Sequence, residues 1–251
     1  MDGILESPSM PTAAHRCFAL VPCAGVGERA EAGGPKQSAR LAGRSVVAHT
    51  LMALTAVREI EATLVVLAPD DDAFEHHAPE FRGAQAWTAR CGGATRAASV
   101  AAGLAELQRR GIAHDDWVLV HDAARCLVRP AWIAELISAC RDDEVGGLLA
   151  LPLADTLKEA QPASMQRVHA DRVVATVPRG GKWLAQTPQM FRLGLLQRAL
   201  AAAGASVTDE SSAVEALGLA PRLVHGDIEN LKLTWPRDFA LAARLLETRP
   251  S

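Results

Sequence analysis

The sequence predicts an α/β fold of three layers, in which helices cover both faces of a mostly parallel β-sheet. Apolar runs of strand length alternate with longer helical patterns from Phe18 to about Leu153. These runs are continuously apolar rather than alternating with polar residues, as is typical of strands buried on both faces. Each run is followed by a helical pattern, the order expected of a parallel sheet with crossover helices.

The expected elements can be placed in order along the chain. Strands are expected at 18–21, 62–67, 85–90, 117–120, 148–151, 222–224 and 231–233. Helices are expected at 95–109, 130–140, 194–203, 213–217 and 236–246. In the helix at 130–140, we expect Ala131, Ile133 and Ile137 on the buried side. Pro236 suits the first turn of the last helix, and the capping groups at 208–212 suit the start of the helix before it.

Residues 155–178 interrupt this alternation. Charged and polar residues alternate there with single apolar ones, and the centre at 161–164 is turn-like. This pattern predicts an exposed β-hairpin, an arm at about 154–180. Because an isolated hairpin is only marginally stable in water, we expect the arm to pack against a second subunit and form a homodimer. A surface insertion without a partner is the alternative.

Length and composition limit the class of protein. A chain of 251 residues with 49% hydrophobic and 22% charged residues is long enough to bury a substantial core. A formal net charge of −3 gives no basic field, which argues against nucleic acid as the main partner. The longest apolar runs, such as 146–153, are too short to cross a membrane. We read residues 16–251 as one domain that carries the arm.

The N-terminus and the cysteines favour a cytoplasmic protein. The first fifteen residues contain two acids and two prolines and lack a basic segment, so residues 1–15 are expected to form a disordered leader rather than a secretion signal. The five cysteines are odd in number and have no C-x-x-C spacing. This argues against a disulfide framework or a structural zinc site and favours a reducing compartment.

The stretch from Ala19 to Arg44 carries the strongest chemical signal. An apolar run ends at Pro22, and a glycine-rich turn with Gly25 and Gly27 follows it. Glycine lets backbone N–H groups approach a phosphate closely, because it has no Cβ and tolerates positive φ. Arg29 and Lys36 add two cations, which suit a polyphosphate. The stretch therefore indicates a nucleoside triphosphate site.

Other interpretations of this stretch fit less well. Residues 25–30 match the loose dinucleotide pattern G-x-G-x-x-G/A, but the expected acidic residue about twenty positions later is missing from 45–50. Pro35 and Lys36 also interrupt the helix that this motif requires. No Walker sequence G-x-x-x-x-G-K-[ST] occurs. A plain strand–helix turn with two surface cations remains the structural alternative.

Several polar signals are expected at the same edge of the sheet. In open parallel sheets, ligands bind at the carboxyl ends of the strands. That edge receives Gly25, Arg29, Gly92-Gly93, His121-Asp122 and Asp155, each of which follows an expected strand. Asp122 could instead only cap a turn, and His121 could serve only as a hydrogen-bond partner of the backbone.

The ordered motifs resemble those of the 2-C-methyl-D-erythritol 4-phosphate cytidylyltransferase family, over nearly the whole chain. The motifs are Pro22-x-Ala24-Gly25-x-Gly27-x-Arg29, Pro35-Lys36-Gln37, Gly92-Gly93-x-x-Arg96-x-x-Ser99-Val100, Val120-His121-Asp122-Ala123-Ala124-Arg125, Asp155-Thr156-x-Lys158, Thr187-Pro188-Gln189, Thr208-Asp209-Glu210 and Asn230-x-Lys232-x-Thr234. The resemblance implies a Rossmann-like nucleotidyltransferase sheet with a dimerising arm. It also implies cytidylyl transfer from CTP to methylerythritol phosphate, with release of pyrophosphate.

The resemblance also implies roles for individual residues. The catalytic cations would be Arg29, Lys36 and Lys232, and Mg²⁺ would bridge the phosphates with Asp122 as the nearest carboxylate. The nucleotide would contact Pro22, Cys23, Ala24, Gly25, Gly27, Gly92, Gly93, Arg96, Ser99 and Ala123. The acceptor would face Asp122, Arg125, Thr187 and Thr208, and the partner's arm would supply Thr156 and Arg179.

Two motif positions depart from the family pattern. Cys23 and Cys126 stand where the family usually has Ala and Pro. Cys126 removes a restriction on φ directly after Arg125, which bears on the aim of that side chain. We read both cysteines as substitutions of one small residue for another, although a thiol beside the site could be sensitive to oxidation.

Three alternatives remain for the function. A cytidylyltransferase for another polyol phosphate, such as ribitol 5-phosphate, would share the nucleotide half of the site and differ around Arg125, Arg179 and Thr208. An NAD(P)-binding Rossmann protein would bind pyridine nucleotide and not CTP. A binding module without catalysis would need disabled cations, yet Arg29, Lys36 and Lys232 are all present.

Overall fold

A seven-stranded sheet forms the centre of the computed structural model, which describes residues 15–25, 36–160, 172–203 and 207–249. The strand order is β11-β7-β10-β6-β1-β4-β5. Only β10 runs antiparallel to its neighbours in this sheet. The bounds are β1 Cys17–Pro22, β4 Ile60–Val66, β5 Ala86–Ala89, β6 Trp117–Val120, β7 Gly146–Pro152, β10 Trp183–Arg192 and β11 Arg222–His225.

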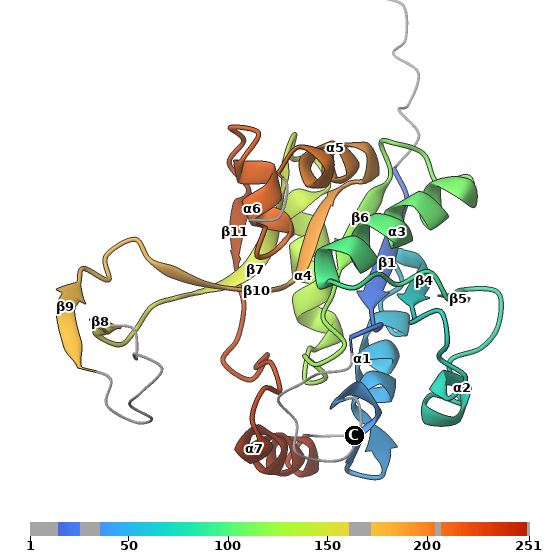
Figure 1. Cartoon of the computed structure of the whole chain (residues 1–251), viewed down its shortest axis with the longest axis horizontal. Helices are drawn as coiled ribbons and strands as arrows, with labels where there is room; N and C mark the ends of the chain where they lie inside the picture. The colour runs from blue at the N-terminus through green and yellow to red at the C-terminus, as the bar shows by residue number, and fades with distance from the viewer. Residues whose placement is uncertain (1–14, 26–35, 161–171, 204–206, 250–251) are drawn as a thin grey trace, which may run out of the picture.

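Helices cover both faces of the sheet, which confirms the three-layer prediction (Figure 1). One face packs against α1 (Val46–Thr55) and α4 (Pro130–Cys140). The other packs against α3 (Arg96–Arg109), α5 (Leu193–Ala203) and α6 (Glu210–Glu215). Consecutive residues of β1 point alternately into the two cores, so a continuous apolar strand is buried on both sides.

Side-chain caps fix where three of these helices begin. The Ser45 hydroxyl accepts a hydrogen bond from the backbone N–H of Ala48 at the start of α1. Thr95 caps α3 in the same way, through the N–H of Ala98. Asp209 caps α6 in a reciprocal capping box with Ser212. Each cap satisfies N–H groups that the first helical turn leaves unpaired, and so holds the start of its helix.

Smaller elements close the carboxyl edge of the sheet. They are the short 3₁₀ helix η1 (Lys36–Ser38), the strands β2 (Arg40–Leu41) and β3 (Arg44–Ser45), the helix α2 (Phe74–His77) and the C-terminal helix α7 (Pro236–Glu247). A third apolar cluster joins Leu41 and Val46 to Leu127, Leu233 and Ala242. The C-terminal segment is thereby packed against the segment that carries Lys36.

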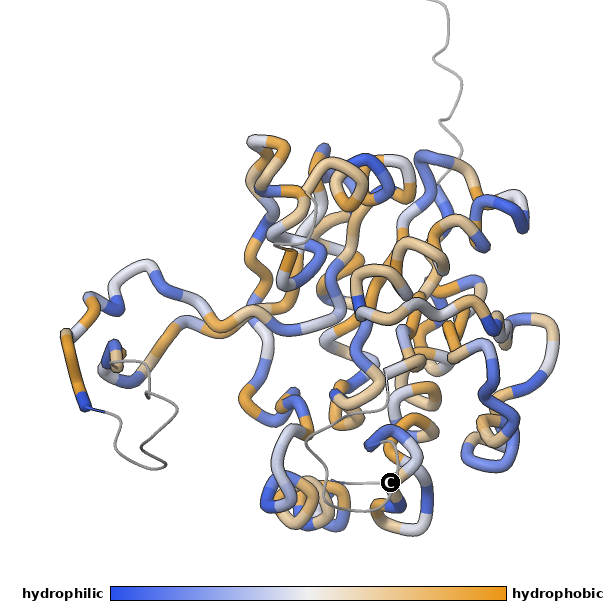
Figure 2. Tube along the Cα trace, in the orientation of Figure 1, coloured by the Kyte–Doolittle hydropathy of each residue, from blue (hydrophilic) through white to orange (hydrophobic). Residues whose placement is uncertain are grey.

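The predicted hairpin is present as a separate two-stranded sheet. Strand β8 (Leu157–Ala160) pairs antiparallel with β9 (Val173–Val177). The pair projects from the body of the molecule as an arm (Figure 1). Figure 2 shows that β9 carries hydrophobic residues at the far end of this arm. Val173 and Val174 are 63% and 62% exposed, so the arm has apolar side chains in water.

The structure corrects three expectations from the sequence. Strand β10 was not expected, because Gln186, Thr187 and Gln189 interrupt its apolar pattern, and its register with β7 shifts between Ala185 and Gln189. Residues 231–233 form no strand. The Leu233 N–H instead donates to the Ala124 carbonyl at 2.9 Å.

The third correction concerns α4. Ala131 is exposed, because the buried stripe runs through Ile133, Leu136, Ile137 and Cys140, spaced by three or four residues. The leader predicted over residues 1–15 lies, apart from His15, outside the described residues.

Candidate active site

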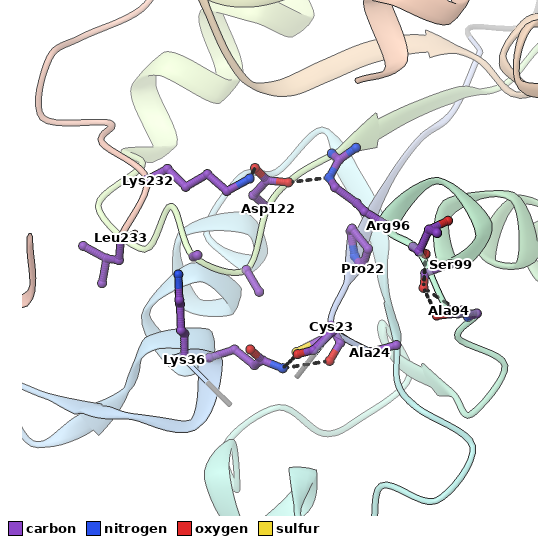
Figure 3. A pocket seen from close by; sticks show the side chains of 16 residues that line it. Pro22, Cys23, Ala24, Lys36, Ala94, Arg96, Ser99, Asp122, Lys232 and Leu233 are labelled. Carbon is purple, nitrogen blue, oxygen red and sulfur yellow. Dashed lines mark hydrogen bonds and ion pairs between the residues drawn. The ribbon is translucent and has the colours of Figure 1, made fainter. Parts of the chain in front are cut away.

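A pocket of about 420 Å³ opens at the carboxyl ends of β1 and β6, where the sequence predicted the site. Figure 3 shows Asp122 and Arg96 on one side of it and Lys36 with Cys23 on the other. The lining residues are Pro22, Cys23, Ala24, Gly25, Lys36, Gln37, Gly93, Ala94, Thr95, Arg96, Ser99, Asp122, Ala123, Ala124, Lys232 and Leu233.

Lys36 and Gln37 connect the segment after β1 with the C-terminal segment on the side of the pocket opposite Asp122. The Gln37 amide donates to the carbonyls of Cys23, at 3.1 Å, and of Gly25, at 2.8 Å. These bonds hold the backbone that follows β1. The Lys36 ammonium donates to the Thr234 carbonyl at 3.0 Å. A neutral carbonyl is a weaker partner for a lysine than an anion, so exchange of this carbonyl for a phosphate would be favourable for Lys36.

The turn between β5 and α3 is held tightly by the protein itself. A Cβ on Gly92 would lie 2.7 Å from the Leu67 carbonyl oxygen and 2.2 Å from the Ala24 Cβ. The Gly93 N–H donates to the Ser99 hydroxyl at 3.1 Å. The resemblance implies that both glycines contact the nucleotide, but packing against Ala24 and Leu67 already requires glycine at position 92.

Asp122 lies at the centre of a cluster of opposite charges. One of its oxygens, Oδ1, accepts from the Arg96 Nε at 2.7 Å. The other, Oδ2, lies 2.8 Å from the Lys232 ammonium and 3.9 Å from the Arg125 Nε. Burial alone would raise the pKa of Asp122, but the charges of Arg96 and Lys232 outweigh it and hold that pKa well below its usual range. Asp122 is therefore ionised.

A relay of hydrogen bonds fixes the backbone at Asp122. The His121 Nε2 lies 3.2 Å from the Arg125 carbonyl, an acceptor, so Nε2 carries the proton. The Nδ1 atom then accepts from the Thr187 hydroxyl at 3.1 Å, and that hydroxyl accepts from the Asp122 N–H at 3.1 Å. Burial lowers the pKa of His121 to about 4, so the imidazole stays neutral. His121 therefore serves as a structural link in this relay.

Arg125 and Asn230 connect the Asp122 turn to the C-terminal segment. Arg125 donates to the Asn230 carbonyl at 2.7 Å. The Asn230 amide donates to the Gln186 side chain at 3.1 Å and to the Thr187 carbonyl at 2.9 Å. Asn230 is fully buried. Lys232, two residues after Asn230, pairs with Asp122 through its side chain. This network therefore fixes the backbone position from which the Lys232 side chain extends.

The structure brings most of the predicted residues together. Eleven of them line the pocket: Pro22, Cys23, Ala24, Gly25, Lys36, Gly93, Arg96, Ser99, Asp122, Ala123 and Lys232. Three others support it from behind: Gly92 packs on Ala24, and Arg125 and Thr187 hold the Asp122 turn. Gly27 and Arg29 lie outside the described residues.

Three further predicted residues neither line the pocket of their own chain nor support it from behind. Thr156 directly precedes β8 of the arm, and Arg179 follows the end of β9. Thr208 is exposed just before α6, where its backbone N–H donates to the Ser212 hydroxyl at 3.2 Å. Their predicted contacts with the acceptor remain predictions, and those of the arm require a second subunit.

The side chains around Asp122 do not match a magnesium site formed by the protein. Both oxygens of Asp122 already face cations, and a divalent ion there would be repelled by Arg96 and Lys232. Within the described residues, no three side chains of His, Cys, Asp or Glu gather closely enough to hold a metal ion. Magnesium needs several oxygen ligands, and a single occupied carboxylate does not supply them.

Sequence reasoning assigned no role in the site to Glu210, Gln37 or Asn230. All three stand inside the quoted motifs, so the motifs themselves were the available signal. Glu210 and Asn230 lie behind the pocket, and their contacts join segments distant in sequence. Such contacts depend on tertiary structure, which spacing along the chain does not reveal.

Comparison with known proteins assigns the chain to a family. The family model described as 2-C-methyl-D-erythritol 4-phosphate cytidylyltransferase matches residues 17–248. The chain belongs to this family. A solved structure titled 4-diphosphocytidyl-2C-methyl-D-erythritol synthase superposes with a TM-score of 0.80 at 39% identity, covering 92% of this chain and 99% of that one. The family enzyme from Thermus thermophilus gives 0.71 at 32% identity, covering 93% of this chain and 100% of that one.

Curated relatives agree with this assignment. The cytidylyltransferase of Paraburkholderia phymatum is 50% identical, over 92% of this chain and 96% of its own length. The bifunctional enzyme IspD/IspF of Albidiferax ferrireducens is 58% identical over 94% of this chain. The chain spans 54% of the length of that bifunctional relative. Among the described residues, no helix is long and apolar enough to cross a membrane.

Proposed function

We propose that this chain transfers the cytidylyl group of CTP to 2-C-methyl-D-erythritol 4-phosphate and releases pyrophosphate. Membership of the cytidylyltransferase family supports this assignment. The observation that carries it is the pocket itself, in which Lys36 and Lys232 approach one cavity from two chain segments. A strand-end pocket lined by separate cations suits a ligand with several phosphates.

The proposed reaction needs cations and alignment more than a base. A phosphate oxygen of the acceptor attacks the α-phosphorus of CTP, a new P–O–P bond forms, and the α–β bond breaks with its electron pair leaving on pyrophosphate. A phosphate monoester is already anionic at neutral pH, so no residue must remove a proton. Catalysis then rests on positioning and on stabilising the charge that grows on the phosphates.

The residues divide this work according to where they lie. Lys36, together with Arg29 seven residues earlier in the sequence, would neutralise the triphosphate and the leaving pyrophosphate. Lys232 would contact the α-phosphate and the incoming phosphate. Asp122 holds Lys232 before the substrates arrive, at 2.8 Å. Gly93 and Ser99 form the wall of the pocket nearest α3, which suits the base and ribose.

Magnesium remains part of the proposal, with the phosphates as its principal ligands. The triphosphate offers several anionic oxygens, which are the ligands that magnesium prefers. Its charge would help to neutralise those oxygens when it is bound. Asp122 is the nearest carboxylate in the pocket, but it is paired with Arg96 and Lys232. We therefore assign no step of the reaction to a magnesium ion held by this carboxylate.

A homodimer is the second part of the proposal. Strand β9 of the arm carries exposed Val173 and Val174, and burying such side chains stabilises an interface. Thr156 and Arg179 do not line the pocket of their own chain. Crossing of the arm to a second subunit would bring them to the partner's acceptor site, and the two sites would then depend on the dimer.

Pyrophosphate release tests the proposed function. The protein would be assayed with Mg²⁺ and each of four nucleoside triphosphates, with either methylerythritol phosphate or ribitol 5-phosphate as acceptor. Release only with CTP and methylerythritol phosphate is expected. Release with CTP and ribitol phosphate alone would replace the acceptor and keep the chemistry. No release from folded protein, together with tight binding of a pyridine nucleotide, would favour the dinucleotide-binding alternative.

A further inference from the structure

Glu210 is a buried carboxylate next to the pocket that no proposed step uses. It is the first residue of α6 and is 1% exposed. Its Oε1 and Oε2 accept from the two terminal nitrogens of Arg96, at 2.7 and 2.9 Å. Such a two-bond pair between a carboxylate and a guanidinium fixes both planes as well as the distance. Glu210 therefore sets the orientation of Arg96.

Glu210 is itself fixed to the central sheet. The preceding residue, Asp209, caps α6 and accepts from the Gln189 amide at 2.8 Å. The other end of that amide accepts from the Ser211 N–H at 2.7 Å. Gln189 lies in β10, opposite Val120 of β6. The start of α6 is therefore held by the strand next to the one that leads to Asp122.

Arg96 transmits this fixed position to the pocket. Its Nε donates to Asp122 Oδ1, while its two terminal nitrogens are bonded to Glu210. Every nitrogen of the guanidinium thus has a carboxylate partner. The two carboxylates lie on two edges of one planar group, so the position of Glu210 constrains that of Asp122. The remaining oxygen of Asp122 then faces Lys232.

We infer that Glu210 is a positioning residue, which acts through Arg96 and Asp122 to hold Lys232 at the place where the acceptor phosphate arrives. The expected effect of Glu210 on turnover rests on the proposed function, whereas its effect on the position of Lys232 does not. Without the carboxylate of Glu210, three cations (Arg96, Arg125 and Lys232) would share the single charge of Asp122. The terminal nitrogens of Arg96 would turn toward the pocket, and Lys232 would lose its fixed partner.

Kinetics of Glu210→Gln test this inference. We expect kcat with CTP and methylerythritol phosphate to fall about 10- to 100-fold, the loss that a small misplacement of a catalytic group produces. The KM for CTP is expected to change less than kcat, because Glu210 does not itself line the pocket. Glu210→Asp keeps the charge but shortens the reach, so its kcat should lie between those of Glu210→Gln and the unchanged protein.

A double-mutant cycle tests whether Glu210 acts through Arg96. In an Arg96→Ala background, Glu210→Gln should cause no further loss of kcat, because the group that it orients is gone. Losses that multiply in the double variant would mean that Glu210 acts independently of Arg96 and would overturn the inference. This double variant also removes the unpaired buried carboxylate that Arg96→Ala alone would leave.

Asp116→Asn is the matched control for a purely structural effect. Asp116 is 4% exposed and pairs with Arg16 at 2.6 Å, at the opposite end of the sheet. The Asp116→Asn substitution is expected to lower the unfolding midpoint and leave kcat per folded molecule unchanged. If Glu210→Gln loses activity only in proportion to its unfolded fraction, as this control does, Glu210 has no positioning role.

Chemical labelling of Lys232 gives a readout that needs no turnover. Acetylation by a lysine-reactive ester would be followed by mass spectrometry, with Lys182 as the internal reference. We expect Lys232 to react at least about threefold faster in Glu210→Gln than in the unchanged protein, because a freed ammonium is more accessible. Unchanged labelling of Lys232 would overturn the inference, even for a protein that fails the pyrophosphate assay.

Discussion

At the scale of single residues, the two lysines of the pocket have partners of different charge. Lys232 faces the carboxylate of Asp122 at 2.8 Å, whereas Lys36 donates to a backbone carbonyl at 3.0 Å. An arriving phosphate must compete with an anion for Lys232, but only with a neutral group for Lys36. Of these two lysines, Lys36 is therefore the more readily available to the triphosphate.

Lys36→Ala tests this role directly. Turnover is expected to fall by roughly two to four orders of magnitude, as is typical when a group that stabilises the transition state is lost. Arg58→Ala, which removes an exposed cation just before β4 and away from the pocket, is the control and should be near normal. Both rates would come from pyrophosphate release. Near-normal turnover in Lys36→Ala would remove Lys36 from the mechanism.

The cysteines give a second prediction at this scale. Burial raises the pKa of Cys17 and Cys140 to about 11 and that of Cys23 and Cys126 to about 12. Cys91 is the exposed one of the five. A thiol-reactive dye at about pH 8 should therefore label Cys91 in the folded protein and all five after unfolding, since the thiolate is the reactive form. Rapid labelling of Cys23 in the folded protein would contradict this.

At the scale of elements, Asp116 joins the starts of two neighbouring strands. It precedes β6, and its carboxylate accepts from both the backbone and the side chain of Arg16, the residue before β1. A fourth bond comes from the Ala113 N–H at 2.9 Å. Asp116 thus fixes the ends of β1 and β6 opposite the pocket, and both strands lead to pocket residues.

Asp116→Asn is expected to lower the free energy of unfolding by about 1–3 kcal/mol, because it weakens hydrogen bonds to a charged group. Burial opposes ionisation, but Arg16 and the backbone N–H groups outweigh it and lower the pKa of Asp116 below 3.8. The stabilisation is therefore fully present above pH 3.8 and is lost as pH falls through the lower native pKa. Urea unfolding at several pH values measures the difference in free energy of unfolding between the unchanged protein and Asp116→Asn. A difference that grew toward acidic pH would contradict this assignment.

The order of the elements explains why the sequence located the pocket but not all of its support. Recognisable motifs contain Lys36, Asp122 and Lys232, and the carboxyl ends of parallel strands meet at one edge. Strand β10 was missed because polar Gln186, Thr187 and Gln189 interrupt its apolar pattern. Those same residues bond to Asp122, Asn230 and α6. The polar side chains that support the site are therefore the ones that make the strand unrecognisable from its hydrophobic pattern.

At the scale of the whole molecule, the arm separates some predicted site residues from the pocket. The described part of the chain supplies Lys36, Asp122 and Lys232 to one cavity, while Thr156 and Arg179 stay in the arm. The apolar end of the arm is exposed in a single chain. A second copy of the chain is the partner that would account for both facts.

Mixing two inactive variants tests this shared site. Lys36→Ala and Arg179→Ala are each expected to be inactive alone. A mixed dimer would contain one site with both residues intact, so random exchange should restore about a quarter of normal activity. Subunit exchange would be confirmed by mass spectrometry of differently tagged chains. Absence of recovery after confirmed exchange would refute the shared site.

The most direct test of the whole account follows oxygen atoms through the reaction. Methylerythritol phosphate with ¹⁸O in its phosphate would be incubated with CTP, Mg²⁺ and the protein, and the products analysed by mass spectrometry. Attack of the acceptor phosphate on the α-phosphorus predicts that all label stays in the diphosphate of the cytidylylated product and that pyrophosphate carries none. Release of CMP, or label in pyrophosphate, would contradict cytidylyl transfer at this pocket.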